Sequence, residues 1–129
     1  MALSEPDGVP GIFEKLGRAT QGMVLDSAGV VLTRREQICR LAMERKLPAV
    51  GRGRFFPEAG CVASYGEDVG AMYHRAAYFV DRILKGARPS DLPIERATKF
   101  ELVINRKTAN ALGLTLPPAL MLRADQVID

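Results

Sequence analysis

Apolar residues recur at helical spacing along much of the chain, and the clearest example follows Tyr65. Its apolar stripe consists of Val69, Met72, Ala76, Val80 and Ile83. Because these positions are three or four residues apart, they predict one long amphipathic helix from about Glu67 to Lys85. Gly86 comes directly after it, where a helix commonly ends.

Shorter patterns precede this helix. A short first helix is predicted by the apolar positions Val9, Ile12, Phe13 and Leu16. The run 22–25 predicts a buried strand. Residues 33–36 read Thr-Arg-Arg-Glu, a capping-box pattern, so a second helix should begin there and end before Pro48. With a further strand at 48–50, the order is that of a βαβ unit, in which a right-handed crossover joins two parallel strands.

The remaining patterns complete an α/β chain. Residues 61–63 predict a third strand, and 87–98 contain two prolines and predict an extended connector. A strand is predicted at 100–104, followed by Asn105 as the N-cap of a helix that runs through Leu112. A pair of prolines near the C-terminus begins a last short element.

Composition and charge narrow the classes of function. The chain has 129 residues, the size of one domain, with 18 basic residues against 15 acidic ones and a net charge of +3. Since the basic residues are interspersed with acidic ones, they predict a mixed solvated surface and no nucleic-acid partner. The loop 51–54, Gly-Arg-Gly-Arg, could cradle an anion, but a solvated loop is the preferred interpretation.

Few residues are available for catalysis or metal binding. His74 is the single histidine, and it lies off the apolar stripe, so we expect it on the surface. Cys39 and Cys61 are too far apart in sequence for a metal knuckle or a redox pair. Two buried thiols are the preferred interpretation, with a disulfide left open. We therefore expect no enzyme, no metal and no cofactor.

The N-terminal residues do not predict a secretory signal. The first residues lack a basic segment followed by an apolar run, and no stretch approaches the ~20 apolar residues of a transmembrane helix. As written, the chain is expected to remain in the cytoplasm.

Four stretches carry a resemblance to a known family. They are LDSAGVVLTRREQICRLAMERKLPAV (25–50), AGCVASYG (59–66), RAAYFVDRILKGARPSDLPIE (75–95) and TKFELVINRKTANALGLTLPPALMLRADQVID (98–129). These stretches resemble the substrate-binding proteins of ABC transporters with a type I periplasmic-binding-protein fold. Some members are thought to carry aromatic or branched amino acids. Such proteins are usually more than twice this long, so the resemblance implies a C-terminal fragment.

The resemblance implies a fold and a division of the chain. The expected fold is a three-layer, parallel-sheet lobe of a periplasmic binding protein, incomplete because the first lobe is largely missing. Residues 1–129 would form a single partial domain. Within it, 9–64 would be the second-lobe βαβ segment, 65–99 the hinge and a first-lobe helix, and 100–129 the return strand and C-terminal helix.

The resemblance also implies where a solute would bind, since ligands of such folds lie at the carboxyl ends of parallel strands. The expected ligand-binding residues are Asp26, Ser27, Phe56, Ser64 and Tyr65. Asp26 could pair with an ammonium group and Ser27 could hold a carboxylate, but Asp26 could instead simply cap a turn. For Tyr65 the preferred interpretation is a core residue before a helix cap, and for Phe56 it is a loop anchor.

The function that follows is solute binding in an ABC import system. The ligand would be a small amino-acid-like or organic-anion solute, and the partner an ABC permease. The full-length family would be periplasmic or membrane-anchored. Two alternatives remain: a non-functional truncated remnant, and a small α/β interaction domain that dimerises through the helix at 67–85.

Overall fold

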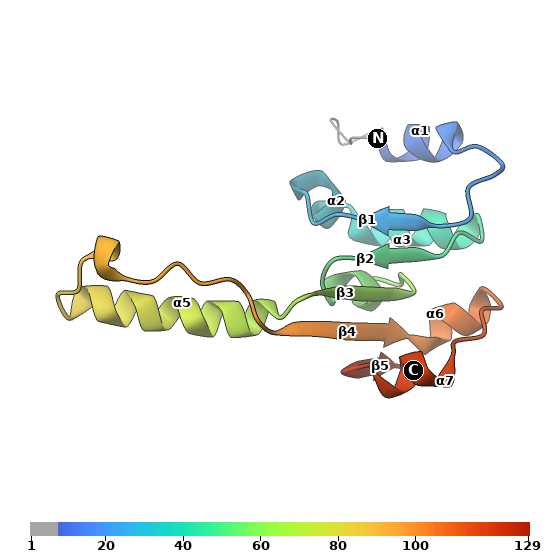
Figure 1. Cartoon of the computed structure of the whole chain (residues 1–129). Helices are drawn as coiled ribbons and strands as arrows, with labels where there is room; N and C mark the ends of the chain where they lie inside the picture. The colour runs from blue at the N-terminus through green and yellow to red at the C-terminus, as the bar shows by residue number, and fades with distance from the viewer. Residues whose placement is uncertain (1–7) are drawn as a thin grey trace. The chain divides into compact units, whose positions relative to one another are not determined.

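The computed structural model describes residues 8–129, so the first seven residues of the expected 1–129 domain lie outside the described part. The described chain forms two compact units. The sheet unit comprises residues 8–66 and 101–129, and the helix unit comprises 67–100 (Figure 1).

The elements alternate between helices and short strands. In order they are α1 (Gly8–Lys15), β1 (Met23–Leu25), α2 (Gly29–Thr33), α3 (Arg35–Glu44), β2 (Ala49–Gly51), α4 (Phe55–Glu58), β3 (Ala63–Glu67), α5 (Val69–Leu84), the 3-10 turn η1 (Pro89–Asp91), β4 (Phe100–Asn105), α6 (Arg106–Ala111), α7 (Pro118–Leu122) and β5 (Gln126–Ile128). The predicted α/β class is confirmed. β3 begins two residues later than predicted, and β5 was not predicted.

The five strands form one sheet in the order β1-β2-β3-β4-β5. β1 pairs with β2, β2 with β3, and β4 with β5, each in parallel. The register of the first three strands puts Val24, Val50 and Ala63 in one row and Leu25, Gly51 and Ser64 in the next. The predicted βαβ unit from β1 through α3 to β2 is therefore confirmed.

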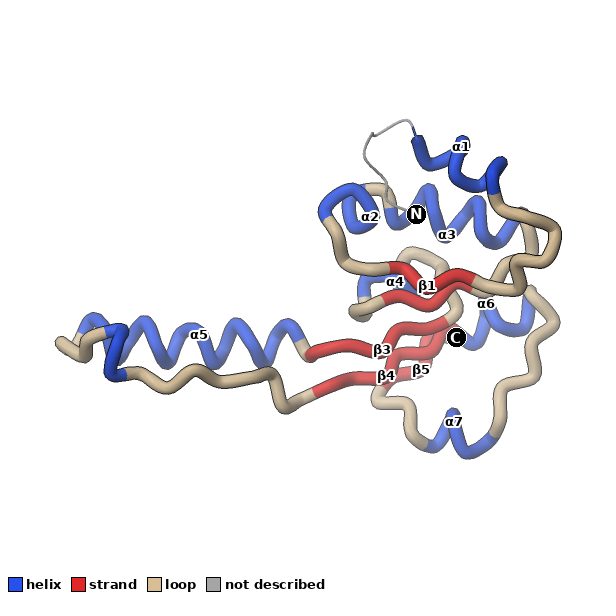
Figure 2. The backbone as a smooth tube through the Cα atoms, turned by 45° about the horizontal axis from the view of Figure 1, so that its top comes forward, coloured by secondary structure: helices blue, strands red, loops and turns tan. Residues whose placement is uncertain are grey.

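The core of the sheet unit lies on one face of these strands. It consists of Val9, Phe13, Leu25, Ile38, Cys39, Ala42, Ala49, Phe56 and Cys61. These residues come from α1, α3, α4, β1, β2 and the segment before β3, and α3 lies between α1 and the sheet (Figure 2). On the opposite face Val24 is 91% exposed and Val50 is 37% exposed. Period-two alternation along β1 and β2 therefore separates a covered face from an open one.

The predicted capping box is wrong. Thr33 is the last residue of the short helix α2, and its hydroxyl donates to the carbonyls of Gly29 and Val30 within that helix. Arg34 occupies the N-cap of α3 without a side-chain bond to the helix. A Ser or Thr that follows a helical turn can bond back into that turn, which competes with capping the next helix.

The prediction of two buried thiols is also wrong. Cys39 and Cys61 form a disulfide, with sulfur atoms 2.05 Å apart. Both residues are 2% exposed. Helical periodicity shows that Cys39 faces the core, but only the packing of α3 over the segment before β3 brings Cys61 opposite to it.

The helix unit consists of α5 and the extended segment that follows it. The predicted long helix is confirmed, and the Asp68 carboxylate accepts the N–H of Ala71 at 2.9 Å as its N-cap. No residue of α5 is buried. The exposed large apolar residues of this unit are Val69, Met72, Tyr73, Tyr78, Val80, Ile83, Leu84, Ile94 and Phe100. The amphipathic helix thus leaves its apolar stripe largely uncovered within its own unit.

Candidate functional site

β1, β2 and β3 run in parallel, so the carboxyl ends of β1 and β2 lie at the same edge of the sheet. The first row beyond these two strand ends contains Asp26, Arg52 and, within β3, Tyr65. The N–H of Arg52 donates to the carbonyl of Leu25 at 3.2 Å, so the ladder extends to this row. Since ligands of open α/β sheets bind at the carboxyl ends of strands, this row defines the candidate site.

Asp26 and Ser27 form the first wall of this edge. The Asp26 carboxylate accepts the N–H of Ser27 at 2.7 Å, and Asp26 is exposed. The hydroxyl of Ser27 donates to the carbonyl of Arg52 at 2.6 Å, which ties the end of β1 to the end of β2. A carboxylate offers about four lone-pair positions, so one N–H bond leaves Asp26 able to accept an ammonium group.

The 51–54 loop forms the second wall. Gly51 is required because a Cβ there would overlap the ring of Phe56. Gly53 has a φ of 120°, which a residue with a side chain rarely adopts. The two glycines therefore let this loop lie directly against the phenylalanines of α4.

Arg54 ties this loop to its surroundings. Its guanidinium lies 3.1 Å from a Glu58 carboxylate oxygen and 3.9 Å from one of Glu101, and it donates to the side-chain oxygen of Gln126. With two carboxylates beside it, Arg54 is partly neutralised and is a poor anchor for a second anion. This arrangement favours a structural role for Arg54 over the anion cradle considered from sequence.

The structure separates the five residues expected to bind ligand. Asp26, Ser27 and Tyr65 lie at the open edge, and Tyr65 is 61% exposed. Phe56 and Ser64 are each 0% exposed. Ser64 faces the covered side of the sheet, and its hydroxyl has no hydrogen-bond partner. Phe56 and Ser64 are thus placed to support the site from beneath.

Arg52 was not among the residues expected to bind ligand, although it lies in the same row. Its main-chain carbonyl holds Ser27, and its side chain lies against Gly66, where a Cβ would come within 3.1 Å of the Arg52 Cγ. Its position two residues after the strand predicted at 48–50 was a signal available in the sequence.

A separate groove lies within the helix unit, between α5 and the segment 89–99. It encloses about 950 Å³, and its walls include Met72, Phe79, Leu92 and Ile94. Arg75 crosses it and forms a bidentate pair with Glu95, with N–O distances of 2.6 and 2.5 Å. This mostly apolar groove is suited to a protein surface rather than to a small polar solute.

Two charged pairs shape the electrostatics of the helix unit. A hydrogen bond from Lys99, at 2.6 Å, holds the pKa of Asp68 below its ordinary value. A hydrogen bond from Arg75 likewise lowers the pKa of Glu95, and Glu95 raises that of Arg75. These shifts follow from ion pairing between side chains, which favours the charged forms of both partners.

Residues 8–129 contain neither a metal-binding cluster nor a membrane-spanning helix. Within that range no three His, Cys, Asp or Glu side chains cluster closely enough to hold a metal ion. Over the same residues no helix is long and apolar enough to span a bilayer.

Comparison with known proteins identifies the family. A family model described as ABC transporter substrate binding protein matches residues 6–128. Since this match covers nearly the whole chain, the chain belongs to the ABC transporter substrate-binding protein family. This is a family of binding proteins and not of enzymes. A separate comparison with curated proteins found no match.

Solved structures share the fold at low sequence identity. A conserved domain protein from Vibrio cholerae matches 98% of this chain with a TM-score of 0.90 and 26% identity. A chain from Streptococcus pneumonia, solved in complex with L-Trp, matches 99% with a TM-score of 0.87 and 23% identity. A substrate binding protein with adhesive properties from Clostridium difficile, in a ligand-free, open structure, matches 99% with a TM-score of 0.70 and 18% identity. The match spans 43% of each of these chains.

Proposed function

We propose that this chain contributes one wall of a solute-binding cleft in an ABC import system. The observation that carries the proposal is the row Asp26, Arg52 and Tyr65 at the carboxyl edge of β1–β3, stabilised by the hydrogen bond from Ser27 to the Arg52 carbonyl. Family membership supports the class of function, and the geometry of this row supports the proposed location. The partner that receives the solute would be an ABC permease.

The side chains at this edge favour an amino-acid-like solute. The exposed Asp26 carboxylate suits a ligand ammonium group, and a charge-assisted hydrogen bond of this kind contributes about 1.5 to 3 kcal/mol. The exposed Tyr65 ring offers an apolar surface to a ligand side chain. We assign direct contact to Asp26, Ser27 and Tyr65, and support from beneath to Phe56 and Ser64.

L-Trp is the first ligand to test, because the chain from Streptococcus pneumonia was solved with it. The chain itself contains no tryptophan. The fluorescence anisotropy of L-Trp, excited beyond the tyrosine band, therefore reports on bound ligand without protein background. We expect saturable binding that competes with other amino acids of the preferred class.

Variants at the carboxyl edge test the assignment of the site. Asp26→Asn should weaken binding about 10- to 100-fold, as expected for loss of a charge-assisted hydrogen bond. Glu44→Gln, on the exposed side of α3, is the matched control and should bind like the parent. Equal affinity of Asp26→Asn and the parent would remove Asp26 from the site.

Affinity should also depend on a wall that faces this edge from the other side of the cleft. The match spans 43% of each similar solved chain, and a ligand held by one wall alone gains fewer contacts against the same entropic cost. Fusing the unmatched part of the Vibrio cholerae chain to this one should tighten binding. If neither form shows a thermal shift with any amino acid or aromatic acid, solute binding is rejected.

A second candidate function, self-association through α5, is favoured by a specific observation. No residue of α5 is buried, and its apolar side chains Val80 and Met72 are 55% and 49% exposed. Sedimentation should then show dimers that Met72→Glu with Val80→Glu abolishes. The control, His74→Glu on the opposite side of the helix, should leave them intact. A parent chain that sediments as a monomer at all concentrations rules this function out.

A further inference from the structure

A disulfide bond joins the middle of α3 to the segment that leads into β3. Its two cysteines, Cys39 and Cys61, are 22 residues apart in sequence and each is 2% exposed. We propose that this bond is formed by oxidation in the cell and acts as a clamp. It holds α4 in place and, through α4, the 51–54 loop of the candidate site.

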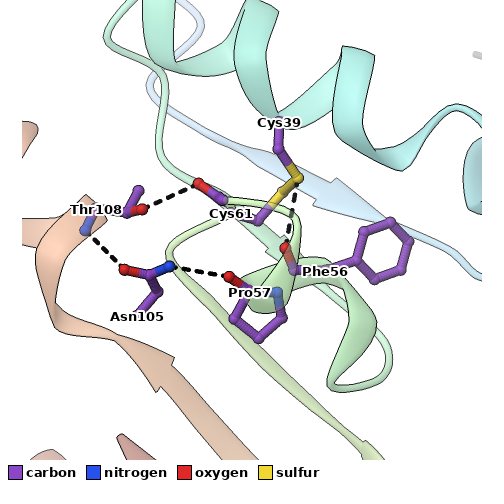
Figure 3. The surroundings of a disulfide bond; sticks show 7 residues. Cys39, Phe56, Pro57, Cys61, Asn105 and Thr108 are labelled. Carbon is purple, nitrogen blue, oxygen red and sulfur yellow. Dashed lines mark hydrogen bonds between the residues drawn. A yellow bond between two sulfur atoms is a disulfide. The ribbon is translucent and has the colours of Figure 1, made fainter. Parts of the chain in front are cut away.

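The bond lies directly against α4 (Figure 3). The N–H of Cys61 donates to the carbonyl of Phe56 at 3.0 Å, and the Cys39 sulfur lies 3.6 Å from the same oxygen. Because a disulfide sulfur carries no proton, the second contact is packing rather than a hydrogen bond. α4 has only four residues, and a helix of one turn has little stability of its own. Its position therefore depends on such external contacts.

α4 in turn determines the shape of the 51–54 loop. The Phe56 ring occupies the space where a side chain on Gly51 would lie, and the Phe55 ring does the same at Gly53. The N–H of Phe56 also donates to the carbonyl of Gly53 at 3.2 Å. A displacement of α4 would thus remove the support under the loop whose Arg52 carbonyl holds Ser27.

Two further anchors hold the end of α4 independently of sulfur. The Asn105 side-chain amide donates to the carbonyl of Pro57 at 2.9 Å, and the Thr108 hydroxyl donates to that of Gly60 at 3.1 Å (Figure 3). Without the disulfide, these anchors remain. Loss of the bond should therefore loosen α4 locally while the sheet unit stays folded.

The oxidation is a thiol–disulfide exchange. A thiolate of one cysteine attacks the disulfide of an oxidising thiol protein, and the other cysteine then displaces that protein from the mixed disulfide. Cys39 and Cys61 together lose two electrons and two protons, and the donor disulfide becomes two thiols. Because both sulfurs are enclosed after folding, reductants reach them only when the structure opens. Such bonds form and persist in oxidising compartments, so the clamp is completed there.

Thiol counting and hydrogen exchange test the clamp. The chain is produced in an oxidising compartment, purified without reductant, and alkylated in denaturant; we expect no modified cysteine, and two after reduction. In Cys39→Ala with Cys61→Ala, amides of 54–61 should exchange at least about tenfold faster, whereas those of β1 and β2 keep their protection. The parent, reduced in denaturant and refolded with reductant, separates loss of the bond from loss of side-chain volume and should show the same local change.

Three outcomes would overturn the clamp. The first is a pair of free thiols in the chain purified from the oxidising compartment. The second is unchanged exchange at 54–61 in both bond-free forms. The third is global unfolding of both forms, which would assign the bond to the whole fold rather than to α4. None of these measurements uses a ligand, so they succeed or fail separately from the proposed solute binding.

Discussion

At the scale of single residues, the candidate site depends on positions where a side chain is absent. Gly51 ends β2 with its Cα against the Phe56 ring, so any Cβ would overlap that ring. Phe56 is completely buried beneath it. The absence of a side chain at Gly51 and the buried ring of Phe56 together determine how closely the loop that carries Arg52 packs on α4.

Gly51→Ala should therefore destabilise the protein by about 1 to 3 kcal/mol, as expected for overpacking a filled core. Urea denaturation measures this change. Gly11→Ala is the matched control, since α1 leaves open space around Gly11 and alanine is the better helix former. Equal midpoints for the two variants would show that Phe56 moves aside easily.

Asn105 connects two elements with one side chain. Its carbonyl oxygen accepts the N–H of Thr108 at 2.8 Å as the N-cap of α6, and its amide donates to Pro57. Asn105→Ala should cost about 2 to 4 kcal/mol, the sum of a lost cap and an unsatisfied buried carbonyl. Asn110→Ala, at an exposed position of the same helix, should be close to neutral. Thermal denaturation of both variants gives the comparison.

At the scale of elements, α5 differs from the helices of the sheet unit. Asp68 caps its N-terminus and Lys85 pairs with Asp81 near its C-terminus, yet none of its residues is buried. Helices of this length are marginal in water without tertiary packing. Local interactions such as the pairs of Asp68 with Lys99 and Arg75 with Glu95 therefore matter more here than they would in a helix with a buried face.

Acid should loosen the helix unit first. The pKa values of Asp68 and Glu95 are lowered from 3.8 and 4.5 by Lys99 and Arg75, so their stabilisation is complete above these ordinary values. It is lost as the pH falls through the lowered ones. The protection factor of the Ala71 amide, which is its hydrogen-exchange rate corrected for the intrinsic rate at each pH, should fall on acidification across this range. Asp68→Asn should remove most of that pH dependence at Ala71, and an unchanged acid response would contradict the assignment.

At the scale of the whole molecule, the core is unevenly distributed. Every buried apolar side chain of the described residues lies in the sheet unit, and the disulfide joins two parts of that same unit. Since opening free energies follow local burial, the two units should differ in local stability. The chain is therefore expected to open in stages.

Limited proteolysis should show these stages. Early cuts are expected within 67–100, and the segments 23–51 and 101–111 should resist for longer because they contain core strands. Cleavage sites read by mass spectrometry at short times give the order. First cuts within β1 or β2 would show that the helix unit is protected by contacts of its own.

Much of the fold could be predicted from sequence, and the two errors have different causes. The stripe from Val69 to Ile83 and the Asn105 cap were predicted correctly because their signals are local. The capping box at Thr33 failed because a preceding helical turn accepts the same hydroxyl. The thiol interpretation of Cys39 and Cys61 failed because periodicity describes one element at a time.

The candidate site shows the same division. The sequence by itself determined the α/β order, the long amphipathic helix and the family, since these depend on patterns that neighbouring residues carry. Only the tertiary structure decided that Phe56 and Ser64 are enclosed while Asp26 and Tyr65 are open, and that Arg52 lies in their row. It also decided that α3 is bonded to the segment before β3. These properties arise from contacts between residues far apart in the chain, and the register of the sheet determines which residues meet.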